Sequence, residues 1–351
     1  MITIFTPSSA DEADTNAQNL SVKEIVARLD PDRARVTMLH EGVVDSRIAS
    51  RPNTRLLHWR THGNTLRTVA QLLMSPPDVY FFPREGPLDA AFLALRRRLK
   101  LKTALVTYIV SGGLYNQPYA PSRMRNIHEA DAVFANNVYL AELLEEKVGI
   151  HAGIFYDGID RRYYFPPKMP RAGDSLSVLY AGSFRPYKRV PLVVREAARW
   201  PEVQFRIAGA GEEEQDCRRL AVELGCKNIE FLGHLSPAAL GDEMRHAGIF
   251  FFPSNIEGHP QVLGQAAACG LPAIAMRTYR PDYVLNGGTG FLAESDDELS
   301  EKLAVLIQQP DLRRRMGEAA IAHAAKFDWD VIAGKWLEVF ERVVARRRER
   351  R

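Results

Sequence analysis

One acidic residue in a short loop, Glu257, is the first candidate for chemistry in this chain. It follows a buried-strand pattern over 249–252 and precedes a helical pattern over 261–269, with another strand predicted from Ala273. Strand, helix and strand in this order predict a βαβ unit of a parallel sheet. Ligands of such sheets lie beyond the carboxyl ends of the strands, where a helix N-terminus favours an anion. The segment therefore predicts a site for a phosphate or a sugar phosphate beside a carboxylate.

Two further residues near Glu257, namely Gly258 and Gln265, suit the same site. Gly258 permits close approach of the backbone to a ligand. Gln265 lies one helical turn beyond Gln261, so both amides can face one ligand. Periodicity alone favours an ordinary strand-to-helix crossover with a solvated carboxylate, because lone acidic residues are common in loops.

A second turn carries a glycine and two cations. Gly182, Ser183, Arg185 and Lys188 follow a predicted strand over 177–180 and precede a helical pattern. Arg offers a planar fork of donors and Lys a compact charge, and each hydrogen bond to a charged group contributes about 1.5–3 kcal/mol. The turn suits a diphosphate, and a solvated basic turn is the alternative.

Two series of strands and helices must position these turns. In the first half, strands are predicted near 2–5, 36–38, 79–82, 104–108 and 132–135. Prolines and irregular sequence at 161–175 predict a linker. The second series has strands at 177–180, 204–208, 229–232, 249–252 and 273–276. We expect an α/β chain with two doubly wound parallel-sheet domains, residues 1–160 and 176–327, facing across a cleft.

Length and composition limit the class of protein. With 351 residues, 46% apolar, 25% charged and a net charge of +3, the chain reads as a globular two-domain protein and not as a nucleic-acid binder. Its three cysteines form no C-x-x-C pair, which favours free thiols in a reducing cytosol. The first residues lack a signal-peptide pattern, and no apolar run approaches the roughly 18 residues that span a bilayer. A cytoplasmic protein is expected.

The segment 253–272 resembles the Glu-x7-Glu signature of the retaining glycosyltransferases of family 4, which have the GT-B fold. In that family the first Glu contacts the donor sugar and the second holds the ribose. This chain has Glu257 at the first position and Gln265 at the second. A Gln can hydrogen-bond a ribose hydroxyl without the charge, at roughly half the strength. The family's phosphate-binding Lys matches Lys188, while Ser183 stands where the family has an Arg and Arg185 is the nearest substitute.

The resemblance implies a donor site built from both turns. Glu257, Lys188 and Arg185 are the expected catalytic residues. The expected donor-binding residues are Gly182, Ser183, His234, Leu235, Gly258, His259, Pro260, Gln261, Val262 and Gln265. His234 and Leu235 match the family's loop against the base, and a partly exposed loop histidine is the alternative for His234.

The residues that would bind the acceptor are less clearly indicated by the sequence. Ile109 stands where the family carries a His near the transferred sugar. Candidates for acceptor contacts are Asn16, Arg84, Glu85 and Tyr108, and each also fits a structural or solvated role. Asn16 also fits the cap of the following helix.

The last segment, 328–351, is predicted to be a helix with one apolar face. Ile332, Trp336, Val339, Phe340 and Val343 recur at helical spacing and form a packing surface. The resemblance implies that this helix crosses back onto the first domain.

Two patterns argue against other chemistries. The stretch 209–214 has two glycines followed by three acids, and it lacks the third glycine of a dinucleotide loop. Acids at a helix start would repel a pyrophosphate, so a dehydrogenase is rejected. No Asp-x-Asp follows an apolar strand, and Asp328 and Asp330 form a poor metal site, so no metal and no cofactor are expected.

The sequence thus predicts a retaining, metal-independent transfer of a sugar from a UDP- or GDP-sugar to an unidentified hydroxyl acceptor. One alternative is an inactive nucleotide-sugar-binding protein, because Ser183, Ile109 and Gln265 depart from the family. Another is a different GT-B enzyme, such as a nucleotide-sugar epimerase. The basic runs 96–102 and 346–351 are expected to be solvated helix ends, with peripheral contact at the inner membrane face as the alternative.

Overall fold

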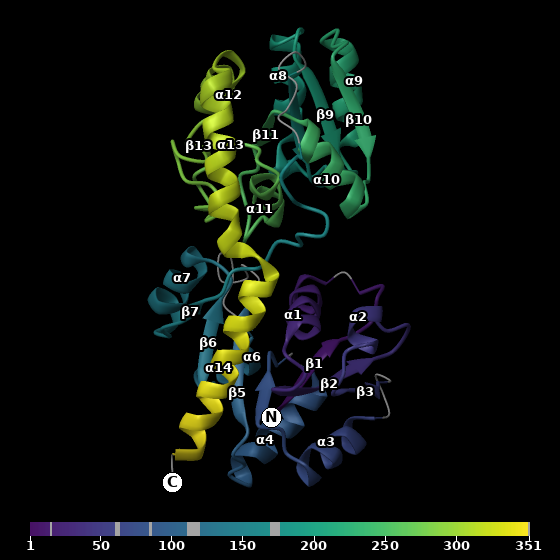
Figure 1. Cartoon of the computed structure of the whole chain (residues 1–351), viewed down its shortest axis with the longest axis vertical. Coiled ribbons are helices and arrows are strands. Elements are labelled where there is room, and N and C mark those ends of the chain that lie inside the picture. The colour runs from purple at the N-terminus through teal and green to yellow at the C-terminus, as the bar shows by residue number, and fades with distance from the viewer. Residues whose placement is uncertain (15, 60–63, 84–85, 111–119, 169–175, 350–351) are drawn as a thin grey trace. The chain divides into compact units, whose positions relative to one another are not determined.

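The chain forms two compact units (Figure 1). The structure is a computed structural model that describes all residues except 15, 60–63, 84–85, 111–119, 169–175 and 350–351. Unit 1 comprises Met1–Asp157 and Trp329–Arg351, and unit 2 comprises Gly158–Asp328. The predicted linker therefore falls within the limits of unit 2, and its residues 169–175 lie outside the described ones.

Unit 1 is built on a seven-stranded parallel sheet with the strand order β3-β2-β1-β4-β5-β6-β7. Its strands are β1 (Ile2–Ser9), β2 (Ala34–His40), β3 (Thr54–His58), β4 (Val79–Phe81), β5 (Ala104–Ile109), β6 (Ala132–Ala135) and β7 (Gly153–Ile154). Its described helices are α1 (Ala17–Arg28), α2 (Ser46–Ala49), α3 (Thr65–Met74), α4 (Pro87–Arg98), α6 (Pro121–His128), α7 (Val138–Val148) and α14 (Trp329–Glu349).

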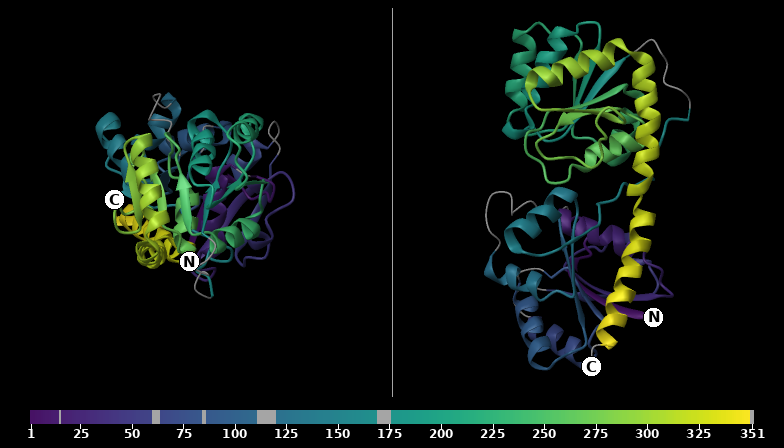
Figure 2. Two further views of the ribbon diagram at one scale, coloured as in Figure 1. Left: turned by 90° about the horizontal axis from the view of Figure 1, so that it is seen from above. Right: turned by 90° about the vertical axis from the view of Figure 1, so that its left-hand side faces the viewer.

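Helices cover both faces of this sheet, as the side view in Figure 2 shows. Strand side chains alternate between the two faces, so each face buries its own set of apolar residues. On one face, Val106 and Tyr108 of β5 pack in a core with α1 and α14. On the other face, Leu105 packs with α3 and α4. The sheet is therefore buried on both sides, as parallel sheets usually are.

The apolar stripe predicted on the last helix is confirmed as packing surface. All five of its residues are buried within unit 1. Trp336 lies at its centre, with ring centroids 5.0 Å from Phe81 and 4.3 Å from Phe155. The whole of α14 belongs to unit 1, although it follows unit 2 in the chain.

Unit 2 repeats the architecture with a six-stranded parallel sheet of order β10-β9-β8-β11-β12-β13. Its strands are β8 (Ser177–Ala181), β9 (Gln204–Ala208), β10 (Ile229–Gly233), β11 (Ile249–Phe252), β12 (Ala273–Met276) and β13 (Gly290–Ala293). Its helices are α8 (Val190–Arg199), α9 (Glu214–Glu223), α10 (Pro237–His246), α11 (Gln261–Ala268), α12 (Asp296–Gln308) and α13 (Pro310–Ala324), with short 3-10 helices η1 (Pro186–Lys188) and η2 (Ala325–Phe327).

The strand order reverses beside the first strand of each unit, β1 in unit 1 and β8 in unit 2. Open parallel sheets bind their ligands at such reversal points, beyond the carboxyl ends of the strands. The predicted α/β class with two doubly wound sheets is confirmed. The sequence patterns missed β3, β7 and β13, which are an edge strand with little burial, a two-residue strand and a strand that begins in a glycine-rich stretch.

Metal-binding clusters, membrane-spanning helices and the state of the cysteines can be compared with the expectations from the sequence. Within the described part of the chain, no three His, Cys, Asp or Glu side chains gather closely enough to hold a metal ion. Among the helices of the described residues, none combines the length and apolar composition that crossing a bilayer requires. Cys217, Cys226 and Cys269 are free thiols, as expected.

Candidate functional site

Both predicted turns meet at one pocket of unit 2, with a cavity volume of about 540 Å³. It lies at the carboxyl ends of β8, β9 and β11, beside the reversal of strand order. The predicted site residues that line it are Gly182, Ser183, Lys188, His234, Leu235, Glu257, Pro260, Gln261, Val262 and Gln265. The structure therefore brings together most of the residues that the two motifs nominate.

An ion pair between Lys188 and Glu257 joins the two turns inside this pocket. The Lys188 Nζ lies 2.5 Å from the Glu257 Oε1, and the side chains are only 14% and 11% exposed. The ammonium also lies 5.1 Å from the ring centroid of Phe252 at the end of β11. A partly buried cation and carboxylate at a strand reversal are suited to a ligand that carries both phosphate and hydroxyl groups.

Hydrogen bonds tie the turn after β8 to the loop after β11. The Arg189 Nε donates to the Pro253 carbonyl at 2.7 Å, and the Asn255 N–H donates to the Tyr187 carbonyl at 2.9 Å. Arg189 also adopts a left-handed backbone (φ 54°), which ends η1 and starts α8. These contacts fix the backbone positions from which the Lys188 and Glu257 side chains extend. The sequence motifs pointed to neither Arg189 nor this pairing, because an arginine after a basic turn carries no distinctive pattern.

Two glycines, Gly182 and Gly209, allow the turns after β8 and β9 to lie close together at the pocket. The Gly182 N–H donates to the Ala208 carbonyl at 3.0 Å. A Cβ on Gly209 would lie 1.9 Å from the Gly182 carbonyl oxygen, and Gly209 has a positive φ of 133°. Only glycine fits such a position. The stretch rejected above as a dinucleotide loop therefore still lines the pocket, through Gly209 and Ala210.

A buried tyrosine, Tyr180, is hydrogen-bonded to the turn that contains Gly182 and Ser183. The Tyr180 hydroxyl donates to the Ser183 carbonyl at 3.1 Å. Burial, and secondarily the charge of Glu257, raises the pKa of Tyr180 far above its ordinary value. Tyr180 is therefore a neutral donor that holds the turn at any physiological pH.

Helix α11 presents its first residues to the pocket. Pro260 is the N-cap, and Gln261 and Val262 follow in the first turn. The free N–H groups of a first turn attract anions. Gln265 lies one turn later and lines the same pocket, as expected from the helical spacing.

Three of the predicted donor-site residues lie elsewhere. Arg185 is exposed and does not line the pocket. Gly258 and His259 are also absent from its lining. The His259 ring packs against Tyr283, with ring centroids 4.3 Å apart and Nδ1 3.2 Å from the tyrosine hydroxyl. His259 therefore packs against Tyr283 instead of lining the pocket.

Of the four predicted acceptor residues, the structure describes two, Asn16 and Tyr108, and neither lines a pocket of unit 1 among the described residues. Asn16 caps α1, since its Oδ1 accepts from the Gln18 N–H at 3.0 Å. Tyr108 is fully buried, and its hydroxyl donates to the Phe155 carbonyl at 2.8 Å. A side chain with no exposed surface cannot line an acceptor site, because its ring belongs to the core beneath α14. Arg84 and Glu85 lie outside the described residues.

Several residues of the basic runs are engaged in ion pairs within unit 1. Asp131 accepts from Arg96 at 2.8 Å and from Arg347 at 2.6 Å. Arg348 pairs with Asp78 at 2.7 Å. Arg96 and Arg347 thus differ from the solvated ends expected from the sequence, whereas the side chain of Arg348 is still 62% exposed.

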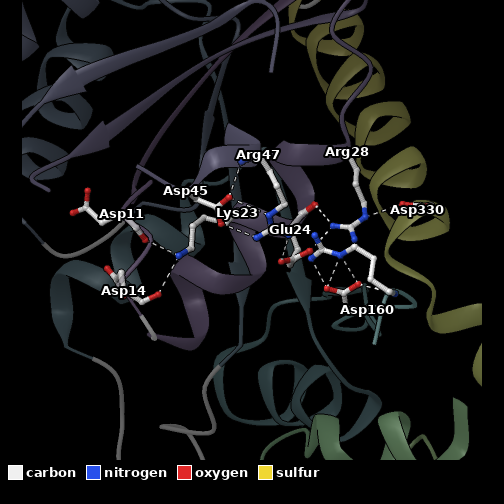
Figure 3. Close-up of polar contacts among 10 residues, drawn as sticks. Asp11, Asp14, Lys23, Glu24, Arg28, Asp45, Arg47, Asp160 and Asp330 are labelled. Atoms are coloured by element: carbon white, nitrogen blue, oxygen red, sulfur yellow. Dashed lines mark hydrogen bonds and ion pairs between the residues drawn. The ribbon is translucent and has the colours of Figure 1, made fainter. Parts of the chain in front are cut away.

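The loop before α1 is held by a buried lysine (Figure 3). Lys23 is almost fully buried, and its Nζ donates to the carbonyls of Asp11 and Asp14 at 2.7 and 3.1 Å. The Asp11 carboxylate accepts from the N–H groups of Glu41 and Gly42 after β2. Burial opposes ionisation of Asp11, but these backbone hydrogen bonds outweigh it and lower the pKa of the carboxyl.

Comparisons with known proteins agree with the motif and the fold. Residues 165–323, which include the whole unit 2 pocket, match the family model of glycosyl transferases group 1. An uncharacterized glycosyltransferase of Methanocaldococcus jannaschii is 27% identical over 215 residues, which are 60% of this chain and 60% of that protein. D-inositol 3-phosphate glycosyltransferase of Streptomyces scabiei is 30% identical over 242 residues, which are 61% of this chain and 54% of that protein. The matches thus span little more than half of these relatives.

A solved structure extends the similarity to both units. The HepE protein of Anabaena, in complex with UDP and glucose, has a TM-score of 0.73 at 16% identity, covering 97% of this chain and 100% of that one. Similarity at this level of identity establishes the fold alone. The chain is therefore similar to the glycosyl transferases group 1 over residues 165–323, and its fold is that of GT-B glycosyltransferases.

Proposed function

We propose that this chain transfers a sugar from a nucleotide diphosphate sugar to a hydroxyl acceptor, with retention at the anomeric carbon and without a metal. The observation that carries the proposal is the Lys188–Glu257 ion pair inside the unit 2 pocket. Both residues lie in the segment that matches the family model, and the similar Anabaena structure holds UDP and glucose. A UDP- or GDP-sugar is the proposed donor.

The proposed mechanism rests on charge. When the sugar leaves, negative charge grows on the nucleoside diphosphate. Lys188 and the N-terminus of α11 stabilise that charge from fixed positions, which lowers the barrier. In this structure the ammonium is paired with Glu257. A diphosphate seated on Lys188 competes for the ammonium and leaves Glu257 to accept hydrogen bonds from the sugar hydroxyls.

We assign the rest of the donor to the remaining lining residues. In this proposal Gln265 hydrogen-bonds a ribose hydroxyl and His234 and Leu235 contact the base, and their position in the pocket lining supports these roles. Retention is supported by the resemblance to family 4, in which the acceptor attacks on the face that the leaving group departs from. No cofactor is part of this proposal, and the acceptor hydroxyl supplies the nucleophile.

A binding protein without transfer activity is the second candidate. Gln265 favours it, because this residue lines the pocket but lacks the charge with which a glutamate would hold the ribose. Donor-dependent release of nucleoside diphosphate distinguishes the two functions. A transferase releases it in the presence of an acceptor, and a binding protein releases none.

The first test is a thermal-shift panel with UDP, GDP, ADP and their common sugars, in EDTA. A ligand at a hundred times its Kd stabilises the folded state by about 2.7 kcal/mol. We expect one nucleotide series to raise the melting temperature. In Glu257→Gln, the free nucleotide should retain its shift and the sugar-bearing form should lose its additional shift. If no nucleotide binds to the wild type, the proposed function is wrong. NMR of the product's anomeric proton then tests retention.

A further inference from the structure

The loop that carries Glu257 ends in a histidine whose ring packs away from the pocket lining. His259 lies between Glu257 and Pro260, the N-cap of α11. Its ring contacts that of Tyr283, with the centroids 4.3 Å apart and the planes tilted by 32°. The His259 Nδ1 lies 3.2 Å from the Tyr283 hydroxyl oxygen. Through this side chain the Glu257 loop contacts a part of unit 2 that lies outside the pocket.

Tyr283 also packs against the helix that borders the pocket. The residue is 1% exposed, and a Cβ on Gly264 of α11 would lie 2.6 Å from its Cε1. Gln265, the next residue of this helix, lines the pocket. The segment that carries Tyr283 is anchored on α13, because the His323 Nε2 lies 2.9 Å from the Asp282 carbonyl oxygen. One buried ring thus contacts both the loop and the helix of the donor site.

Tyr283 further contacts Phe327, which lies near the boundary between the units. The two ring centroids are 4.6 Å apart with the planes at 61°, and Phe327 is fully buried. The Phe327 carbonyl accepts from the Ile159 N–H at 2.7 Å, and Ile159 forms a parallel bridge with Asp328. The chain enters unit 2 at Gly158 and leaves it after Asp328. Phe327 therefore lies where the two boundary segments of unit 2 are hydrogen-bonded to each other.

His259, Tyr283 and Phe327 form a continuous aromatic stack within unit 2. Close-packed side chains transmit a displacement, because few voids are present to absorb it. Energetic coupling between two sites passes through such contiguous contacts when changing one end alters the other. Ordinary core packing predicts the same distances but no effect of one end on the other, so the two interpretations can be separated by experiment.

We propose that His259 and Tyr283 are positioning residues that couple the Glu257 loop to the boundary segments through Phe327. The effect on the donor rests on the proposed function: a sugar bound to Glu257 holds the loop, and the stack then holds the hydrogen bond from Ile159. Coupling between two sites is reciprocal, so a change at the boundary alters the affinity for the donor's sugar. The three stack residues are absent from the described pocket lining, so they act on the sugar through Glu257.

The first test uses two single amides of the ligand-free chain as reporters, by hydrogen exchange followed with NMR. The Ile159 N–H reports on the boundary, and the Asn255 N–H, which is hydrogen-bonded to the turn after β8, reports on the Glu257 loop. His259→Ala changes the loop end of the stack, and Phe327→Leu changes the boundary end. Phe291→Leu is the matched control, because it alters a partly buried aromatic residue of β13 that is not one of the three stack residues.

We expect His259→Ala to speed exchange of the Ile159 N–H about tenfold, and Phe327→Leu to speed exchange of the Asn255 N–H about as much. Phe291→Leu should change neither. The Phe205 N–H of β9 reports on opening of the whole unit and should keep its rate in every variant. The proposal is overturned if each variant affects only its own end, or if the Phe205 N–H changes as much as the reporters. His259→Ala alters a partly exposed loop residue, so it keeps the test decisive if Phe327→Leu does not fold.

The second test measures the donor by calorimetry, with UDP, GDP and their common sugars on the wild type and on Phe327→Leu. The free nucleotide should bind both proteins with a Kd equal within about twofold, and the additional affinity of the sugar-bearing form should fall about fivefold in the variant. An unchanged sugar affinity in Phe327→Leu would overturn the link to the donor. If no nucleotide binds to the wild type, the proposed function is wrong and the donor effect falls with it, while the amide reporters still support or refute the coupling.

Discussion

The two units share one topology but hold their central turns in different ways. In unit 2, the turns after β8 and β9 approach closely through their backbones, with Gly209 against the Gly182 carbonyl. In unit 1, backbone hydrogen bonds also join the corresponding turns after β1 and β2, and side chains add to them: the Asp11 carboxylate accepts from the Gly42 N–H, and Lys23 clamps the same loop. A Cβ on Gly42 would lie 3.9 Å from Asp11, which is ordinary contact.

The unit 2 pocket also differs in charge from a pocket of about 230 Å³ in unit 1, which is lined by residues from α1, from the ends of β4 and β5, and from α6. The unit 2 pocket contains a cation and a carboxylate 2.5 Å apart. The unit 1 pocket is lined mainly by amides, a hydroxyl and apolar groups, with Arg123 as its one charge among the described lining residues. One topology therefore provides the place for a ligand, and the side chains determine its class. This comparison teaches that the paired charges suited to a diphosphate lie in the unit 2 pocket, whereas the described lining of the unit 1 pocket has no carboxylate.

The largest expected effect is that of removing the cation from unit 2. Lys188→Ala should lower kcat/KM for transfer by about 10²–10³-fold, because a fixed donor to the developing charge is lost. Arg185→Ala is the comparison, since this exposed arginine lies off the pocket and should change kcat/KM less than about threefold. Steady-state kinetics with the donor identified by thermal shift measures both. Near-normal turnover of Lys188→Ala would refute its role with the phosphate.

The glycine contact in unit 2 should be the next most sensitive feature. Gly209→Ala forces a Cβ to 1.9 Å from the Gly182 carbonyl at a positive φ, so it should destabilise unit 2 by about 2–4 kcal/mol and abolish nucleotide binding. The corresponding Gly42→Ala in unit 1 should cost less than about 0.5 kcal/mol. Urea unfolding monitored in each unit measures the difference. Equal effects would show that the two turns are built alike.

These differences also explain how much the sequence predicted. The unit 2 site rests on two short motifs, and Glu257, Gln261 and Gln265 lie within one loop and helix. Their spacing along the chain fixes their spacing in space, so the sequence places them at one pocket. In unit 1, Gln18, Thr107 and Asn126 come together only when distant segments fold, and each is an ordinary residue in its own element.

The same reasoning explains the errors in unit 1. Tyr108 was an attractive candidate because it ends a strand, but alternation along β5 directs it to the core and Thr107 to the pocket. The sequence predicts that successive side chains of β5 point to opposite faces of the sheet. It does not predict which face is covered by α14 and which borders the pocket. That assignment depends on where α14 packs, and this helix starts only at Trp329, far along the chain from β5.

The side-chain clamp in unit 1 gives a smaller and local prediction. Lys23→Met removes the ammonium from the Asp11 and Asp14 carbonyls, so the loop before α1 should lose about 2 kcal/mol of protection. Hydrogen exchange of the amides at 11–28 measures this locally, which matters because two units need not unfold as one transition. Lys335→Met, at an exposed position of α14, is the control and should leave those amides unchanged. Unchanged exchange in Lys23→Met would show that the loop holds without its clamp.

The smallest expected effect tests the charge of the unit 2 pocket through ionic strength. Nucleotide diphosphate binding on Lys188 gains from attraction between opposite charges, which salt screens, so its Kd should rise about threefold to tenfold between 50 and 500 mM NaCl. In Lys188→Ala this attraction is absent, so the Kd should change less than about twofold over the same range. Calorimetry with UDP or GDP on the wild type and on Lys188→Ala measures both slopes. Equal slopes in the two proteins would mean that Lys188 does not attract the phosphates, and the contrast in charge between the pockets would then not determine the ligand.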